Sequence, residues 1–284
     1  MRTILFPTDF SDAATRAFIY ALRLAAKIDA KIVTLHVFQK PDLSGLPHIP
    51  KSLEDFYNSI DLYEFENYRD AVPVLDKIQD EQDLNAVEVT HTLHEGDTVE
   101  TILERATAEE AELIVMGTTG ARGLKEIILG SVAGEVLENA PCPVLAIPEQ
   151  AIFDGLINNL AFTTNYQPKE QKGLAKLREL FSNFAPHIHC VNVDLAHTEA
   201  YHQRMDDFSA AAGEADNLSF HVLDGTDFQT VLTAFLDEME IDILAMVTHQ
   251  RTFFEELFHY SKTKALSYHS RTPILSLPEG ILEA

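Results

Sequence analysis

The sequence predicts an α/β protein made of two tandem doubly wound domains, each with a Rossmann-like, five-stranded, mostly parallel sheet. Three observations support this fold class. The length of 284 residues is enough for about two domains. The second half repeats the pattern of the first, and short apolar runs alternate with amphipathic segments. We place the two domains at residues 1–149 and 156–281.

The two halves of the chain resemble each other near their beginnings and at their ends. Residues 3–9, Thr-Ile-Leu-Phe-Pro-Thr-Asp, resemble residues 159–165, Asn-Leu-Ala-Phe-Thr-Thr-Asn. Residues 141–148, Pro-Cys-Pro-Val-Leu-Ala-Ile-Pro, resemble residues 271–278, Arg-Thr-Pro-Ile-Leu-Ser-Leu-Pro. The beginning and end segments are separated by more residues in the first half than in the second, which indicates an insertion near residues 40–68.

Apolar runs and amphipathic segments alternate along the first half in the order expected for such a domain. Strands are predicted at residues 4–6, 31–38, 87–93, 113–116 and 144–147. Helices are predicted at residues 13–26, 99–110 and 131–138, with Ser11 as the N-cap of the first. Because the strand runs are apolar on both faces, we expect helices on both sides of a parallel sheet with right-handed crossovers.

The inserted stretch is rich in large apolar side chains. Residues 53–68 contain Phe56, Tyr57, Leu62, Tyr63 and Phe65. We expect this stretch to pack onto the domain rather than to dock a partner, with a lid over the ligand pocket as the alternative.

The composition fits a folded, soluble protein and excludes several function classes. The hydrophobic fraction is 46%, and the formal net charge is −24. A field this negative repels nucleic acids and anionic membrane surfaces, although it allows a local site for one phosphate chain. No secretory leader or membrane span is apparent, so we expect a cytoplasmic protein. Cys142 and Cys190 are far apart, and we expect buried thiols rather than a disulfide or a metal pair.

Two loops are candidates for a ligand site, because doubly wound sheets bind ligands at the carboxyl ends of strands where the strand order reverses. The loop after the first strand reads Pro-Thr-Asp-Phe-Ser at residues 7–11. The loop after the fourth contains Gly117 and Gly120, for which we expect close backbone approach and positive φ. Gly130 and Ser131 then place free N–H groups, a hydroxyl and the positive end of a helix dipole together, which favours phosphate.

The spacing Gly-x2-Gly-x9-Gly-Ser at residues 117–131 follows an apolar strand and accompanies the N-terminal Pro-Thr-Asp-x-Ser. This combination resembles the ATP-binding branch of the universal stress protein family, whose fold is adenine nucleotide alpha hydrolase-like. The Pro-Cys-Pro-Val-Leu strand agrees with it. The resemblance covers essentially the whole chain, since the second half resembles another copy and the length is that of a tandem member.

The resemblance implies an ATP site in the first half, with Mg²⁺ or Mn²⁺ on the phosphates and no catalytic residue. The implied binding residues are Pro7, Thr8, Asp9, Val37, Met116, Gly117, Gly120, Gly130, Ser131 and Val132. The first three lie beside the adenosine, Val37 presents its backbone to the adenine edge, and Gly117 lies by the ribose. The last four hold the phosphates. Arg122 and Lys125 either add positive charge there or lie on a solvated surface.

The second half departs from this pattern. Val247, Gln250, Tyr260 and Asn165 stand where the first half has Gly117, Gly120, Gly130 and Asp9, and only Ser261 matches its counterpart, Ser131. A valine disfavours positive φ, and a tyrosine would occupy the space of the phosphates. We therefore predict one ATP per chain. The resemblance also implies that strands 144–147 and 274–277 pair about a pseudo-two-fold axis, as in an intramolecular dimer, and it leaves a further homodimer open.

Histidine pairs are weaker candidates. His91 and His94, or His187 and His189, have the spacing of metal ligands. His187 and His189 would share one face of a strand, but no Cys on that face and no paired carboxylate accompanies them. We expect core or surface histidines instead of a metal site.

The leading functional hypothesis is a cytoplasmic ATP-binding regulatory protein of the stress-response type rather than an enzyme. No residue of the motif is an obvious base for activating water, so any hydrolysis is expected to be slow. The alternatives are a nucleotide hydrolase or adenylyl-transferring enzyme of the same α/β group, and a nucleotide-free scaffold or small-ligand binder that uses the second half.

Overall fold

The computed structural model describes residues 1–43, 51–118, 130–195, 197, 200–213, 215–248 and 271–283. The first half contains β1 (Arg2–Pro7), α1 (Asp12–Ile28), β2 (Ala30–Phe38), α2 (Lys51–Glu81), β3 (Val89–Glu95), α3 (Thr98–Ala108), β4 (Leu113–Gly117), α4 (Ser131–Asn139) and β5 (Val144–Ile147). The second half contains β6 (Asn159–Thr163), the 3₁₀ turn η1 (Pro168–Glu170), α5 (Gln171–Leu180), β7 (His187–Asp194), α6 (Ala200–Ala212), β8 (Leu218–Asp224), α7 (Phe228–Glu238), β9 (Ile243–Val247), β10 (Ile274–Leu277) and α9 (Gly280–Glu283).

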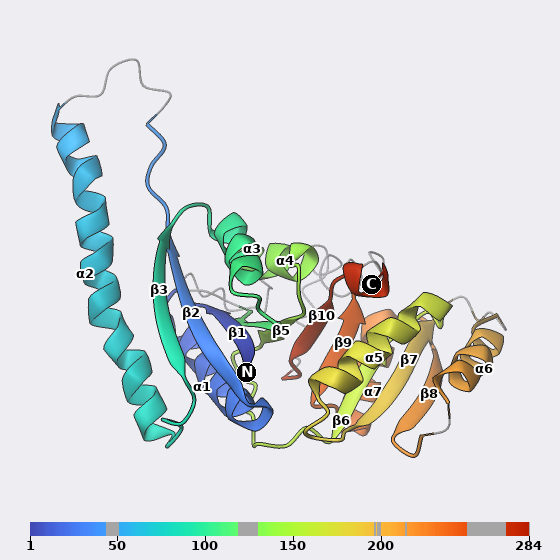
Figure 1. Ribbon diagram of the computed structural model, residues 1–284. Coiled ribbons are helices and arrows are strands. Elements are labelled where there is room, and N and C mark those ends of the chain that lie inside the picture. Colours follow the sequence, from blue (N-terminus) through green and yellow to red (C-terminus); the bar gives the residue numbers. More distant parts are fainter. Residues whose placement is uncertain are drawn as a thin grey trace.

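The ten strands form one continuous sheet in the order β3-β2-β1-β4-β5-β10-β9-β6-β7-β8 (Figure 1). Within each half all neighbouring strands are parallel. The two halves meet at β5 and β10, which are antiparallel, with Leu145 opposite Leu275. The doubly wound fold class and the pairing of the final strands are therefore confirmed.

Local sequence explains most element boundaries. The Ser11 hydroxyl accepts a hydrogen bond from the backbone N–H of Ala14, which confirms Ser11 as the N-cap of α1. Strand β3 begins two residues later than predicted, because the N–H of Val87 is used in a turn to the carbonyl of Leu84. Cys190 is buried and Cys142 is half-buried, and both are free thiols. No helix among the described residues is both long and apolar enough to cross a membrane.

Helices cover both faces of the sheet (Figure 1). One face packs against α1 in the first half and α5 in the second, and a single apolar cluster continues across both, with Phe6, Phe18, Phe162 and Phe181 fully buried in it. The other face has separate clusters under α3 and α4 and under α7. The first of these two clusters forms the floor of the candidate site.

The insertion forms most of α2, and the expectation that it packs onto the domain is wrong. Of this 31-residue helix only Leu75 and Ile78, near its end, are buried. Phe56 and Tyr63 are 60% and 62% exposed. Figure 1 shows α2 at the outer edge of the sheet beyond β3, with its first turns farthest from the domain. The apolar pattern is that of a helix, but most of its length has no core to face.

Candidate functional site

The candidate site lies where the strand order reverses. From β1 the chain moves outward through β2 and β3, and it returns to β4 on the other side of β1. The N–H of Thr8 donates to the carbonyl of Leu35 at 2.9 Å, and the N–H of Thr118 donates to the carbonyl of Ile147 at 3.1 Å. These bonds align the carboxyl ends of β1, β2, β4 and β5 at one edge of the first half, which is where such sheets bind ligands.

The loop after β1 is a tight turn fixed by its own side chains. The Thr8 hydroxyl accepts from the N–H of Phe10, and a carboxylate oxygen of Asp9 accepts from the N–H of Ser11, both at 3.0 Å. Phe10 has a φ of 57°, which lets the chain reverse sharply between the end of β1 at Pro7 and the start of α1. The turn holds Thr8 buried and leaves Asp9 exposed at the strand end.

Helix α4 begins directly beside the exit of β4. The N–H of Gly130 donates to the carbonyl of Thr118 at 2.7 Å, and no side chain caps the helix. In contrast, side chains cap α1 and α3, and each of these helices has an acidic residue in its first turn, which α4 lacks. The first N–H groups of α4, at Ser131 and Val132, therefore present an uncompensated positive end, which suits an anion.

An unpartnered hydroxyl lies at the same place. Thr118 is 5% exposed, and its Oγ1 has no hydrogen-bond partner among the residues that the structure describes. A buried polar group without a partner costs about 1–3 kcal/mol, so such groups call for an explanation. Sequence reasoning missed Thr118, although it directly follows Gly117 in the glycine motif. A ligand hydrogen bond would satisfy its hydroxyl.

An apolar surface adjoins the uncapped helix. Met116 is buried in the cluster under α3 and α4, and Val37 and Val132 pack against that cluster. These side chains come from β4, β2 and α4, so the fold brings together three residues that are far apart in the chain. Apolar side chains that suit a flat ring thus lie next to the helix end that suits an anion.

Some sequence expectations for the glycines need correction. Gly117 ends β4 as an ordinary strand residue and does not have the positive φ that we expected. Gly130 has a φ of −58°. At Gly130, for which we expected only open N–H groups, a Cβ would lie 3.3 Å from the carbonyl oxygen of Thr118. Gly120, Arg122 and Lys125 lie outside the described residues.

The second half repeats the turn after the first strand but closes it internally. The Thr164 hydroxyl accepts from the N–H of Tyr166, whose φ is 56°, as Thr8 and Phe10 do in the first half. However, the fully buried carboxylate of Glu170 accepts from the Thr164 hydroxyl at 2.7 Å and from two further backbone N–H groups, those of Asn165 and Gln167, at 3.0 Å. An internal anion thus satisfies the donors of this turn.

At the end of β9, as in the turn after β6, a polar group has a hydrogen-bond partner within the protein, whereas its counterpart at the end of β4 is open. The Thr248 hydroxyl, which corresponds to that of Thr118, accepts from the N–H of Glu279 at 3.1 Å. Val247 is buried in the cluster on the α5 face, next to Gly173 and away from the face that carries the candidate site in the first half. Neither Gly117 nor Val247 has a positive φ, so our argument that Val247 disfavours binding through its φ is wrong. Gln250, Tyr260 and Ser261 lie outside the described residues.

The histidines serve in hydrogen-bond networks. The His91 ring bonds to the Thr34 hydroxyl and the Asp76 carboxylate. Nitrogen atoms of His187, His189 and His221 lie 2.9–3.0 Å from the hydroxyl of Ser219. Among the residues that the structure describes, no group of three His, Cys, Asp or Glu is arranged to hold a metal ion.

The His189 environment has an electrostatic consequence. Desolvation, together with the neighbouring His187 and His221, lowers the pKa of His189 to about 4. A burial-driven shift of this direction is typical of a neutral structural imidazole.

Comparison with known proteins supports the resemblance. Residues 1–148 match the model of the universal stress protein family. Over 146 residues, 51% of this chain and 81% of the relative, the sequence is 35% identical to a universal stress protein of Methanocaldococcus jannaschii. It is 33% identical over 147 residues, 51% of this chain and 98% of the relative, to one of Thermus aquaticus.

Solved structures support the fold over the whole chain. A universal stress protein of Archaeoglobus fulgidus matches with a TM-score of 0.67 and 20% identity, covering 97% of this chain and 96% of that one. A protein of unknown function from Pseudomonas aeruginosa matches with a TM-score of 0.61 and 16% identity, covering 100% and 95%. At these identities the likeness shows the fold alone.

Proposed function

The chain belongs to the universal stress protein family, and we propose that it is an ATP-binding regulatory protein of the stress response with one nucleotide site, in its first half. The family supports the stress-response role. The nucleotide, its position and its regulatory effect are the proposal. We place its action in the cytoplasm, where ATP is available.

One observation carries the proposal: the contrast between satisfied and unsatisfied groups in the two halves. In the first half the hydroxyl of Thr118 has no partner and α4 has no cap. In the second half Glu170 and the N–H of Glu279 satisfy the corresponding positions after β6 and β9. A buried hydroxyl that is open in one copy and hydrogen-bonded in the other supports a ligand that completes it.

The proposed binding mode follows from the geometry. The N–H groups of Ser131 and Val132 bind the phosphates, aided by the Ser131 hydroxyl, and the apolar side chains of Met116 and Val37 lie beside the adenine. The N–H of Gly130 is used in a hydrogen bond to the carbonyl of Thr118, so Gly130 contributes by leaving room for the phosphates. Since the chain carries a net charge of −24, its long-range field does not attract ATP, and backbone dipoles must act locally. A divalent cation such as Mg²⁺ or Mn²⁺ would be held by the phosphates and would offset their charge.

We expect binding rather than rapid catalysis. Asp9 is the acidic side chain of the proposed site, and one of its carboxylate oxygens is engaged with the N–H of Ser11. With no other evident base among the site residues that the structure describes, phosphate release with saturating MgATP should be slower than about 1 s⁻¹, the low end of ordinary enzyme rates. Faster turnover would favour a hydrolase.

Isothermal titration with MgATP tests the proposal. The wild type should bind, and Gly130→Tyr should abolish binding because its side chain would occupy the space of the phosphates. Gly280→Tyr is the matched control, since a Cβ at Gly280 would meet nothing within 4 Å. Thermal unfolding of each variant verifies that it is folded. Absence of binding to the wild type, or undiminished binding to folded Gly130→Tyr, would refute the site.

A further inference from the structure

Three aromatic rings connect the turn after β1 to the helix α2. The ring centres of Phe10 and His36 are 5.0 Å apart, and the Tyr68 ring of α2 lies 6.0 Å from the first and 6.4 Å from the second. The rings of Tyr68 and His36 are stacked, with an angle of 19° between their planes. We call Phe10, His36 and Tyr68 the aromatic link. It joins α2 to the loop at which we place the nucleotide.

Thr8 holds the two rings of the link that lie outside α2. The Thr8 hydroxyl accepts from the N–H of Phe10, and the Thr8 carbonyl oxygen lies 2.7 Å from Nδ1 of His36. Because a carbonyl oxygen only accepts, Nδ1 is the donor. Thr8 and Asp9 are residues that we place beside the adenosine. A ligand that restrains this turn therefore restrains Phe10 and His36 as well.

The rest of the domain holds the outer part of α2 only weakly. Across residues 51–74, all of which the structure describes, no residue is buried. The Tyr68 hydroxyl is shielded from solvent, but it has no hydrogen-bond partner among the described residues, which opposes burial of its ring. Segments with few buried contacts open locally at small cost in free energy. A change in the restraint on Phe10 and His36 therefore changes how often α2 is released.

The second half contains the corresponding contact in a locked form. Tyr166 stands at the position of Phe10, and its ring packs edge-on against Phe208 of α6 at 5.6 Å. The Tyr166 hydroxyl lies 2.7–2.8 Å from the carbonyl oxygens of Cys190 and His221, on two neighbouring strands. Tyr166 is 2% exposed, whereas Phe10 is half-buried and has no hydroxyl. The contact is thus fixed in the half whose turn is closed internally, and it is free to respond in the half with the proposed site.

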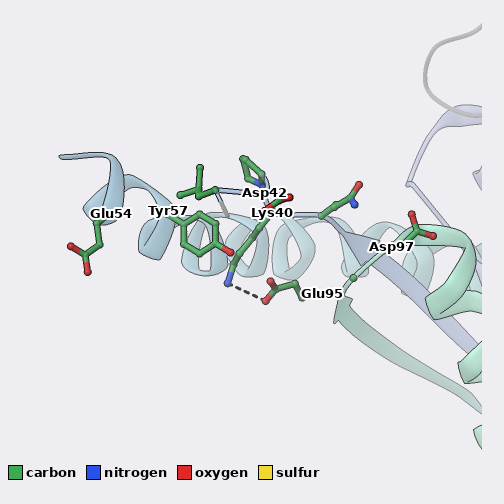
Figure 2. Close-up of a pocket in the computed structure, with 10 residues that line it drawn as sticks. Lys40, Asp42, Glu54, Tyr57, Glu95 and Asp97 are labelled. Carbon is green, nitrogen blue, oxygen red and sulfur yellow. Dashed lines mark ion pairs between the residues drawn. The ribbon is translucent and has the colours of Figure 1, made fainter. Parts of the chain in front are cut away.

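A second contact attaches α2 without these rings. The Lys40 ammonium lies 2.6 Å from a carboxylate oxygen of Asp61 on α2 and 3.0 Å from one of Glu95. It also lies 5.3 Å from the centre of the Tyr57 ring. Figure 2 shows Lys40 beside Tyr57 and Glu95 in a hollow of about 500 Å³. None of these four residues belongs to the proposed nucleotide site, so Lys40 offers a way to loosen α2 that leaves the aromatic link intact.

From these observations we propose that nucleotide binding beside Thr8 and Asp9 is transmitted through the aromatic link to α2, which makes α2 the responsive element of the nucleotide site. The bound nucleotide favours the state in which Tyr68 stays packed on His36. Release of Tyr68 weakens nucleotide binding by the same factor, because coupling between two sites is reciprocal. The inference rests on the proposed function and adds the regulation of that site.

Hydrogen exchange of the full chain, measured by mass spectrometry with and without saturating MgATP, tests the coupling. In the wild type MgATP should slow exchange in residues 51–70 by about fivefold or more, the low end of allosteric couplings. Tyr68→Ala should exchange faster there and should no longer respond to MgATP. In titration calorimetry its affinity for MgATP should fall by the same factor. Tyr68→Phe keeps the ring and loses only the unpartnered hydroxyl, so it should respond as the wild type does.

Lys40→Gln is the matched control, because it loosens α2 by removing two ion pairs. Its residues 51–70 should exchange faster throughout, but MgATP should still slow them. Loss of the response in Lys40→Gln as well as in Tyr68→Ala, or a response that persists in Tyr68→Ala, would overturn the assignment of the aromatic link. MgATP binding that leaves exchange in wild-type α2 unchanged would overturn this inference alone, whereas no MgATP binding would refute the proposed function and this inference with it.

Discussion

Two threonines that end corresponding strands differ in a single hydrogen bond. Thr118 and Thr248 both donate their backbone N–H to the neighbouring final strand, but only the Thr248 hydroxyl has a partner. The glycine spacing predicted where backbone groups would be exposed to a ligand. It could not predict Thr118 or Glu170, because the burial and partners of a side chain depend on segments that meet only in the folded chain.

Replacing Thr118 with valine tests whether its hydroxyl serves a ligand. Thr118→Val removes an unpartnered buried hydroxyl, so the free energy of unfolding without ligand should stay equal or rise. Its affinity for MgATP should fall about three- to tenfold, the value of one hydrogen bond. Thr248→Val should do the reverse, losing about 1 kcal/mol of stability and no affinity. Urea unfolding and titration calorimetry measure both, and equal behaviour of the two variants would contradict this assignment.

The buried carboxylate of Glu170 should be essential to the turn after β6. In Glu170→Gln an amide replaces a charged acceptor of three hydrogen bonds, which should cost about 1–3 kcal/mol of unfolding free energy. The exposed Glu104→Gln on α3 should cost less than about 0.5 kcal/mol. A Glu170→Gln variant as stable as Glu104→Gln in urea would show that this turn does not need the anion.

At the scale of elements, periodicity identified helices and strands but not what covers them. The first helix, its cap and the five strands of the first half were predictable, because their signals are local in sequence. The packing of α2 was not, since an apolar stripe shows which side of a helix is apolar and not whether a partner covers it. The ordinary strand conformation of Gly117 was also not predicted. We expected a positive φ there, but glycine permits a positive φ without requiring one.

The histidine cluster on β7 and β8 should make stability depend on pH. The pKa of His189 is about 4 in the folded chain, against an ordinary value of 6.5. Between pH 6.5 and pH 4 His189 takes up a proton in the unfolded chain but not in the folded chain. The contribution of neutral His189 to the free energy of unfolding is therefore complete above pH 6.5, and it is lost progressively as the pH falls to about 4. His189→Gln should therefore lose less stability than the wild type between pH 7 and pH 4.5.

The exposed His202→Gln on α6 is the matched control for this pH effect and should follow the wild-type curve. Urea midpoints measured at several pH values give the comparison. If His189→Gln shows the wild-type slope, the cluster does not control acid sensitivity.

For the molecule as a whole, two similar halves share one sheet through β5 and β10. All four residues of β5 and all four of β10 are buried, and the Ser276 hydroxyl of β10 donates to the carbonyl of Leu137 on α4. The resemblance to the universal stress protein family implied this pairing, and both halves end in a similar apolar strand. Divergence then left the Thr118 hydroxyl open in the first half and gave its counterpart, Thr248, a partner in the second.

A chain cut after residue 149 should replace the missing half with a second copy. Its β5 would be an apolar edge strand with unpaired backbone groups, which readily pairs with another edge. We expect a dimer by light scattering, while Leu145→Lys in the same fragment should give a monomer. A monomeric unsubstituted fragment would show that β10 is not needed to cover β5.

The number of ATP molecules held by each full-length chain tests the central claim most directly. Native mass spectrometry with excess MgATP should show a mass increase of one nucleotide per chain, and none for Gly130→Tyr. No bound nucleotide, or two per chain, would contradict the assignment of a single site to the half in which the Thr118 hydroxyl remains open.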